Sequence, residues 1–299
     1  MSDQATPRYR GRFAPSPTGP LHFGSLVAAV GSYLQARANG GEWLVRIEDI
    51  DPPREAPGAA DEILRTLDRL GLHWDGAAMY QSTRRAAYED ALEQLRRSGL
   101  LYACGCSRRE IADSSVRGIE GPVYAGTCRS GLAVGRDERA LRIRTDGVRI
   151  VFSDRWQGTI ECALEREVGD FVLRRADGFI AYQLAVAVDD AAQAITEVVR
   201  GADLLLSTPR QIHILQRLGL VPPRYAHLPV AINARGEKLS KQTGATAIAH
   251  EAPRPLLARV LAFLGQPVTP YEDEPLDDFW RRAVRAWRPE SVPRVRAAG

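Results

Sequence analysis

The first fifty residues alternate between the apolar spacing of strands and that of a helix. Residues 9–14 predict a short strand, and residues 43–47 predict a buried one. Between them, apolar residues recur at helical spacing over residues 22–39, which predicts a helix that ends at Gly40. A strand, a Pro- and Gly-rich loop, a helix and a second strand form a βαβ unit, so we predict an α/β fold with a parallel sheet.

The pattern changes in the middle of the chain. Residues 101–130 hold three of the four cysteines and show little regular periodicity. Short strands follow, with a hairpin turn at residues 176–178, so an insertion is expected to interrupt the α/β pattern. The other predicted helices cover residues 59–70, 83–98, 208–218 and 254–264, and the other predicted strands cover residues 141–144, 149–152, 159–163, 171–174, 179–182, 195–199 and 228–232.

The composition is that of an ordinary globular enzyme. Hydrophobic residues make up 44% and charged residues 26% of the 299 residues, and no apolar run approaches the roughly 18 residues that cross a bilayer. The polar residues 1–10 lack the apolar stretch of a signal peptide, so we expect a cytoplasmic protein without a membrane partner. Four cysteines in a chain of this length do not predict a disulfide framework.

Positive charge is unevenly distributed along the chain. The formal net charge of +3 is too small to indicate a nucleic-acid partner by itself. Near the C-terminus, arginines follow an acidic stretch; they are Arg281, Arg282, Arg285, Arg288, Arg294 and Arg296. Two interpretations stay open, a solvated helix with internal ion pairs and a frayed basic tail, or a patch that contacts RNA.

Lysine is almost absent from the chain. Of 40 basic residues only Lys238 and Lys241 are lysines, and they lie three residues apart. A site shaped for a compact ammonium does not accept a planar guanidinium, so chemistry is expected to require both lysines. Two ammonium groups on a loop can neutralise charge on a transferring phosphate. An exposed basic loop, with lysines clustered by chance, is the alternative.

The loop before the first helix can bind phosphate. Residues 12–26 run from a strand into a helix N-terminus, where free N–H groups and the helix dipole attract anions. His22 could donate to a phosphate oxygen, and Gly24 leaves room for a flat base. A βα turn with a capping histidine is the alternative. The lysine pair about 215 residues later makes the combination more specific than either motif alone.

The two segments resemble the hallmark motifs of class I aminoacyl-tRNA synthetases. His22-Phe-Gly-Ser is similar to the His-Ile-Gly-His motif, with Phe and Ser replacing Ile and the last His, and Lys238-Leu-Ser-Lys-Gln is similar to Lys-Met-Ser-Lys-Ser. Residues 12–19, 46–53 and 199–203 resemble the glutamyl and glutaminyl branch. About residues 8–265 match that branch, most closely its shortened paralogues of glutamyl-tRNA synthetase.

The resemblance implies a fold, a reaction and partners. The fold would be a Rossmann-like catalytic domain, and the enzyme a ligase that uses ATP and Mg²⁺ to convert L-glutamate to glutamyl-adenylate. In the shortened paralogues, glutamate then passes to the queuosine base in the anticodon of tRNA(Asp). About 58 residues remain after Lys241, too few for the anticodon-binding domain of glutamyl-tRNA synthetase. A monomer is expected.

The resemblance also implies roles for individual residues. His22, Gly24, Ser25 and Lys241 would bind ATP, and His22, Lys238 and Lys241 would be catalytic. Glutamate would be held by Arg12, Ala14, Ser16, Tyr182 and Arg200, with Glu48 at its amino group. A dicarboxylic amino acid does need guanidinium partners and a carboxylate facing its ammonium. On the residues alone, a solvated strand end is the alternative for Arg46 and Glu48.

Three cysteines predict a metal site in the insertion. Cys104, Cys106 and Cys128 lie in the irregular segment, and thiolates of a cytosolic protein in such a segment suggest zinc. Zinc takes four ligands, and the family resemblance supplies Tyr124 as the fourth. One structural Zn²⁺ would then hold the insertion together, whereas three thiols without metal are the alternative. Cys162 is expected in the core.

Four segments are expected from the patterns and the resemblance together. Residues 1–100 and 176–250 would form the two halves of the nucleotide-binding catalytic domain, residues 101–175 an acceptor-binding-like insertion, and residues 251–299 a helical C-terminal segment with a basic tail. Three other functions remain open: a truncated synthetase that charges tRNA 3′ ends, a small-molecule nucleotidylyltransferase, and a non-catalytic adenylate-binding regulator.

Overall fold

A computed structural model of the protein describes residues 8–114, 117–119, 121–233, 248, 251–268 and 274–298. Lys238 and Lys241 lie outside the described residues, so their assignment stays a prediction. No helix among the described residues is both long enough and apolar enough to cross a membrane.

A parallel sheet forms the centre of one half of the molecule, as the sequence predicts. Its first strands pair in the order β1 (Arg10–Phe13), β2 (Glu42–Ile47) and β3 (Met79–Tyr80). A second parallel pair, β11 (Glu197–Gly201) and β12 (Arg224–Leu228), lies beside β1, where the Thr196 N–H donates to the Arg10 carbonyl over 2.9 Å. The predicted βαβ unit is therefore confirmed, and the carboxyl ends of β1 and β11 meet at one edge.

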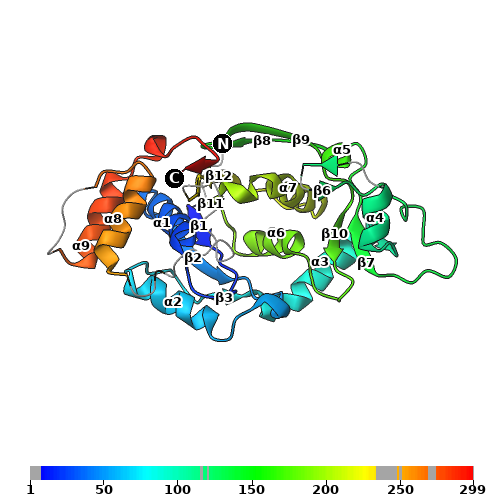
Figure 1. The fold of residues 1–299 in the computed structure, drawn as a ribbon, viewed down its shortest axis with the longest axis horizontal. Helices are drawn as coiled ribbons and strands as arrows, with labels where there is room; N and C mark the ends of the chain where they lie inside the picture. The colour runs from blue at the N-terminus through cyan, green and yellow to red at the C-terminus, as the bar shows by residue number, and fades with distance from the viewer. Residues whose placement is uncertain are drawn as a thin grey trace, which may run out of the picture.

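Helix α1 (Phe23–Ala38) connects β1 to β2 and is buried along most of its length. On its other side lie α8 (Pro253–Phe263) and α9 (Leu276–Ala286), which Figure 1 shows beside α1 at the end of the molecule away from α4. The predicted helices at residues 59–70, 83–98, 208–218 and 254–264 are confirmed; the first three are α2 (Ala59–Arg69), α3 (Arg85–Arg97) and α7 (Thr208–Arg217).

The C-terminal segment differs from one of its two open interpretations, a solvated helix with internal ion pairs and a frayed basic tail. Helix α9 does carry an ion pair, Arg282 to Glu274 at 2.5 Å, but it also buries Phe279 and Trp280 against the core. Strand β14 (Ala297–Ala298) then pairs in parallel with β13 (Val230–Ala231). A partner far away in the sequence orders these residues, and the local charge pattern could not reveal it.

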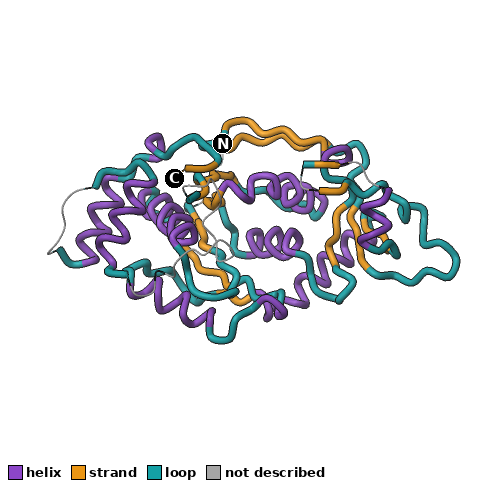
Figure 2. The backbone as a smooth tube through the Cα atoms, viewed as in Figure 1, coloured by secondary structure: helices purple, strands orange, loops and turns teal. Residues whose placement is uncertain are grey.

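The insertion carries its own antiparallel sheet at the opposite end of the molecule (Figure 1). Its strands pair in the order β10 (Phe171–Arg174), β7 (Ala140–Ile143) and β4 (Leu101–Cys104). A hairpin of β8 (Arg149–Asp154) and β9 (Gly158–Ala163) runs along the upper edge in Figure 2, and β8 joins β12 where Asp154 pairs with Tyr225. Short elements complete the insertion: α4 (Arg108–Ser114), β5 (Arg117–Gly118), β6 (Gly121–Pro122) and α5 (Leu164–Glu167).

Two predicted strands are wrong in part. Over residues 179–182 only Ile180 forms a bridge, to Arg174, and Tyr182 begins α6 (Tyr182–Ala192). This helix is buried on most sides, so it lacks the polar face that gives a helix its periodic signal. The strand predicted at residues 228–232 is divided into β12 and β13 at Pro229, since proline has no N–H to donate to a sheet.

Candidate active site

A cavity of about 540 Å³ opens at the carboxyl ends of β1 and β11 and at the N-terminus of α1. Ligands of parallel α/β sheets bind at such edges, where loops leave the strands. The cavity wall contains most of the predicted site residues, namely Arg12, Ala14, Ser16, His22, Gly24, Ser25, Tyr182 and Arg200. The fold thus brings together residues that are up to 188 positions apart in the sequence.

His22 caps helix α1. Its Nδ1 accepts from the Ser25 N–H over 3.3 Å, and the Ser25 hydroxyl accepts from the His22 N–H over 2.9 Å. Because Nδ1 accepts, the neutral ring carries its proton on Nε2. The capping interpretation of His22 is therefore correct, and it leaves the ring able to act as a donor at the cavity wall.

Arg12 is held from behind by a carboxylate that the sequence patterns did not single out. Asp190 on α6 accepts from Arg12 Nε over 3.0 Å and from Nη2 over 3.4 Å, and both side chains are buried. Arg46 Nη1 lies 2.8 Å from the same carboxylate. Burial opposes ionisation of Asp190, but the two guanidiniums outweigh it and hold its pKa below the ordinary value. Asp189 and Asp190, two acids in an otherwise apolar stretch, were the available signal.

Glu48 lies behind the cavity wall and is not among the residues that line it. The Glu48 carboxylate is 3.4 Å from Arg46 Nη2, and both residues are buried, so the interpretation of a solvated strand end is wrong. Burial raises the pKa of Glu48, and the neighbouring arginines offset this only in part. Tyr182 lines the cavity, and burial and the charge of Glu48 raise the pKa of its phenol.

Arg200 projects into the cavity from β11 with one donor unused. Its Nε donates to His227 Nε2 over 3.0 Å, and its Nη2 donates to the Thr208 hydroxyl over 2.8 Å. Nη1 is buried and has no hydrogen-bond partner among the described residues. A buried, unpaired guanidinium N–H is costly, so this atom is suited to an acceptor that a ligand would bring.

His227 is in turn bonded to Asp154, and neither residue was predicted. The two side chains are fully buried, and His227 Nδ1 lies 2.5 Å from Asp154 Oδ2. Burial lowers the pKa of His227 to about 4, with Arg200 acting in the same direction. The pKa of Asp154 also lies below its ordinary value, because hydrogen bonds from the His227 side chain and from backbone N–H groups outweigh burial. Asp154 therefore carries the charge and the imidazole is neutral.

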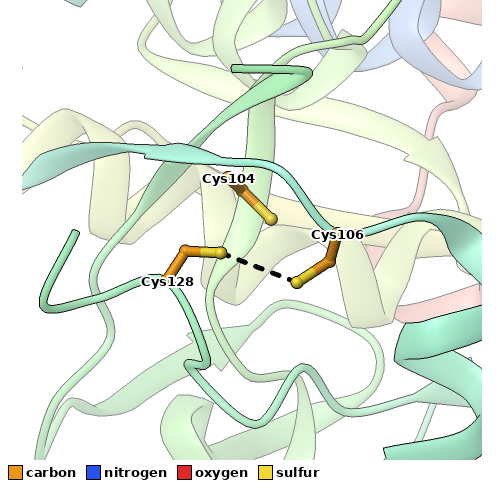
Figure 3. Close-up of side chains that lie close together, drawn as sticks. All are labelled: Cys104, Cys106 and Cys128. Atoms are coloured by element: carbon orange, nitrogen blue, oxygen red, sulfur yellow. Dashed lines mark hydrogen bonds between the residues drawn. The ribbon is translucent and has the colours of Figure 1, made fainter. Parts of the chain in front are cut away.

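The cysteine cluster lies in the insertion, far from the cavity. Figure 3 shows Cys104 from the end of β4, Cys106 from the loop after it and Cys128 pointing toward one another. Their sulfur atoms all lie within 4.8 Å of one another, and Cys106 Sγ is 3.6 Å from Cys128 Sγ. Cys162 is buried elsewhere, in β9, as the sequence predicts.

Tyr124 completes a four-atom cluster. Its phenol oxygen lies 3.4 Å from Cys104 Sγ and 3.6 Å from Cys106 Sγ. Ligands at zinc-bond lengths stand about 3.5–3.8 Å apart around a tetrahedral ion, so these separations fit a single Zn²⁺. Gly169 makes this position possible, since a Cβ there would lie 2.8 Å from the Tyr124 backbone nitrogen. The cluster can therefore bind a metal ion.

Comparisons with known proteins agree with this geometry. The family model "tRNA synthetases class I (E and Q), catalytic domain" matches residues 8–269. A protein of Dechloromonas aromatica named glutamyl-Q tRNA(Asp) synthetase is 60% identical over 289 residues, which are 96% of each chain. A protein of Chromobacterium violaceum with the same name is 57% identical over 285 residues, or 95% of each chain.

Among solved structures, the chain resembles a glutamate-tRNA synthetase from Elizabethkingia anophelis with a TM-score of 0.79 and 24% identity. The similarity covers 97% of this chain and 68% of that one, and at this identity it supports the fold alone. The match over residues 8–269 and the near-complete coverage at 60% identity decide the family. The chain belongs to the class I tRNA synthetases (E and Q), among relatives named glutamyl-Q tRNA(Asp) synthetase.

Proposed function

We propose that the protein activates L-glutamate with ATP and transfers the glutamyl group to the queuosine base in the anticodon of tRNA(Asp). The observation that carries this proposal is the 60% identity over 96% of both chains with a protein named for that substrate. The cavity supports it independently, because two arginines from different strands reach one concave site of about 540 Å³. An amino acid with two carboxylates requires such a pair.

Glutamate would lie between Arg12 and Arg200. The unpaired Nη1 of Arg200 would donate to a substrate carboxylate oxygen, which would remove the cost of burying an unused donor. Arg12 keeps a fixed orientation because Asp190 grips Nε and Nη2. Tyr182, Ala14 and Ser16 would shape the remaining wall, and all three line the cavity. Glu48 would attract the ammonium group from behind that wall.

ATP would lie along the N-terminus of α1. His22, Gly24 and Ser25 line the cavity there, where free N–H groups and the helix dipole favour phosphate. A glutamate carboxylate oxygen would attack the α-phosphorus, forming one P–O bond while the bond to the leaving pyrophosphate breaks. Lys238 and Lys241 would stabilise the charge that develops on the phosphate oxygens. Mg²⁺ bound with the nucleotide would neutralise the pyrophosphate.

The insertion at residues 101–175 would provide the platform for RNA. Cys104, Cys106, Cys128 and Tyr124 would hold one Zn²⁺, whose chemistry would be structural because four protein ligands leave no open position. The ion would fasten β4 to the loop that carries Tyr124 and Cys128. Residues 1–100 and 176–250 would form the two halves of the catalytic domain, with residues 251–299 packed against it.

The test uses labelled glutamate, ATP and purified tRNA(Asp), with and without queuosine, beside tRNA(Glu). We expect label only on the queuosine-containing tRNA(Asp), in a form that survives removal of the 3′-terminal nucleotide. Label on tRNA(Glu) would make the protein a charging enzyme and overturn the proposed acceptor. Absence of glutamyl-adenylate with every tRNA would overturn the activation step as well.

A further inference from the structure

We infer that Asp154 and His227 are positioning residues that hold Arg200 ready for the substrate carboxylate without cancelling its charge. The inference rests on the proposed function, since it gives Arg200 a substrate contact. Neither residue lines the cavity, so each would act through Arg200 and not on glutamate itself.

The direction of each hydrogen bond in this chain of residues is fixed by chemistry. A guanidinium N–H can only donate, so His227 Nε2, 3.0 Å from Arg200 Nε, must accept. The proton of the neutral imidazole is therefore on Nδ1, which donates to Asp154 Oδ2. Asp154 Oδ1 accepts from the backbone N–H groups of Trp156, Gln157 and His227 at 3.0–3.1 Å. Three backbone donors thus fix the carboxylate, which fixes the imidazole, which fixes Arg200.

A neutral partner leaves Arg200 with its charge. Arg12 is paired directly with the carboxylate of Asp190, so the buried charge of Arg12 is compensated within the protein. None of the ion pairs among the described residues involves Arg200, whose partners are an imidazole, a hydroxyl and the Leu204 carbonyl. The carboxylate of Asp154 lies beyond the imidazole. A substrate carboxylate would therefore be the first direct counter-charge that Arg200 meets, and that difference favours its binding.

Two substitutions of His227 separate orientation from simple packing. In His227→Asn, the shorter amide can still reach Asp154 but not Arg200. In His227→Gln, the carbonyl oxygen reaches the place of Nε2 and can accept from Arg200 Nε. We expect the KM for glutamate to rise about ten- to a hundredfold in His227→Asn, the effect of losing a hydrogen bond to a charged group. His227→Gln should stay within about threefold of the wild type, and the KM for ATP should change little in both.

Asp154→Asn tests the tautomer. The three backbone donors keep an oxygen at the Oδ1 position, so the new amide N–H₂ faces His227 Nδ1. The imidazole proton would then move to Nε2 and oppose the Arg200 Nε–H, donor against donor. We expect a rise in the KM for glutamate similar to that of His227→Asn. Nitrogen NMR of ¹⁵N-histidine-labelled protein reports the tautomer directly and needs no substrate.

The control is Val198→Ala, which shortens a buried side chain of β11 outside the cavity and outside this hydrogen-bond chain. Its loss of stability should leave the KM for glutamate unchanged. If His227→Asn and Asp154→Asn lower Tm with an unchanged KM for glutamate, the positioning role is wrong. If His227→Asn does not fold, the KM for glutamate of Asp154→Asn is compared with that of Val198→Ala, and an equal KM in the two variants would refute the positioning role. Wild-type protein that forms no glutamyl-adenylate would refute the proposed function instead, while the NMR tautomer would still test the hydrogen-bond chain.

Discussion

The cavity joins residues from distant parts of the chain, whereas the cysteine cluster comes from one short stretch, residues 104–128, and the two are held in different ways. At the cavity, buried protein partners already fix the functional side chains: Asp190 holds Arg12, and His227 holds Arg200. In the insertion, the three thiols and the phenol face mainly one another. Side chains that are held by buried carboxylates and hydrogen bonds of the protein keep their positions without a ligand. A cluster of thiols and a phenol, in contrast, is held together by the metal ion that it binds.

The largest expected effect comes from breaking the protein's own charge pairing at the cavity. Asp190→Asn takes from buried Arg12 its ion pair among the described residues and leaves Glu48 as the ion-pair partner of buried Arg46. Unpairing a buried charge costs about 3–5 kcal/mol, so the free energy of unfolding should fall by that amount in urea titrations. A loss below about 1 kcal/mol would show that solvent reaches this cluster and that it is not prearranged. Asp203→Asn, at the cavity wall, is the comparison variant.

The second largest effect is expected from acid, which should lower the free energy of unfolding through His227 beside the cavity. The folded-state pKa of His227 is about 4, below the ordinary 6.5, so below pH 6.5 the unfolded chain binds a proton that the folded chain refuses. Stability is therefore full above pH 6.5 and falls as the pH drops to about 4, by up to about 3 kcal/mol. Urea titrations across this range measure the slope. The pKa of His213 is also lowered by burial, so His213 adds to the loss of stability in acid. The difference in this loss between the wild type and His227→Gln gives the contribution of His227.

A substitution of Lys241 tests whether the reaction needs the predicted lysines in addition to the residues that line the cavity. Lys241→Arg keeps the charge but replaces a compact ammonium with a planar fork. We expect the rate of glutamyl-adenylate formation to fall about a hundredfold, as when a group that stabilises transition-state charge is lost, with no change in Tm. Pyrophosphate exchange measures the rate, and Arg281→Lys at an exposed ion pair of α9 is the matched control. Near-normal exchange would refute the role of Lys241.

The smallest effect is expected in the cysteine cluster. Cys128→Ser should remove the metal. Because strands of the insertion also pack in apolar clusters shared with the neighbouring helices and strands, stability should fall by only about 1–2 kcal/mol. Metal analysis of wild type purified without added zinc should give about one equivalent, and the variant far less. Cys162→Ser, in the same insertion but outside the cluster, should keep the metal. Much less than one equivalent of zinc in the wild type would show that the cysteine cluster does not hold a metal ion.

Much of this molecule follows from short stretches of sequence. Apolar periodicity predicts the βαβ unit, the helices α2, α3, α7 and α8 and most strands, because each pattern spans only a few turns or residue pairs. The loop before α1 and the three cysteines can also be recognised from short stretches of sequence. A Pro- and Gly-rich turn into a helix N-terminus predicts phosphate binding, and closely spaced thiols predict a metal site. The roles of Lys238 and Lys241 stay predictions, as do those of the substrate-binding residues.

Only the tertiary structure decided which buried residues hold the side chains of the cavity in place. Asp190 meets Arg12 across 178 residues, and His227 meets Asp154 across 73, on partners that local periodicity does not connect. Helix α6 was missed because it is buried on most sides, and β14 because its partner β13 is distant in sequence. The sequence by itself determined which residue types the chemistry would use. Only the fold decided which of them are charged, which are neutral and which N–H remains for a ligand, because these properties depend on burial and on neighbours brought together in space.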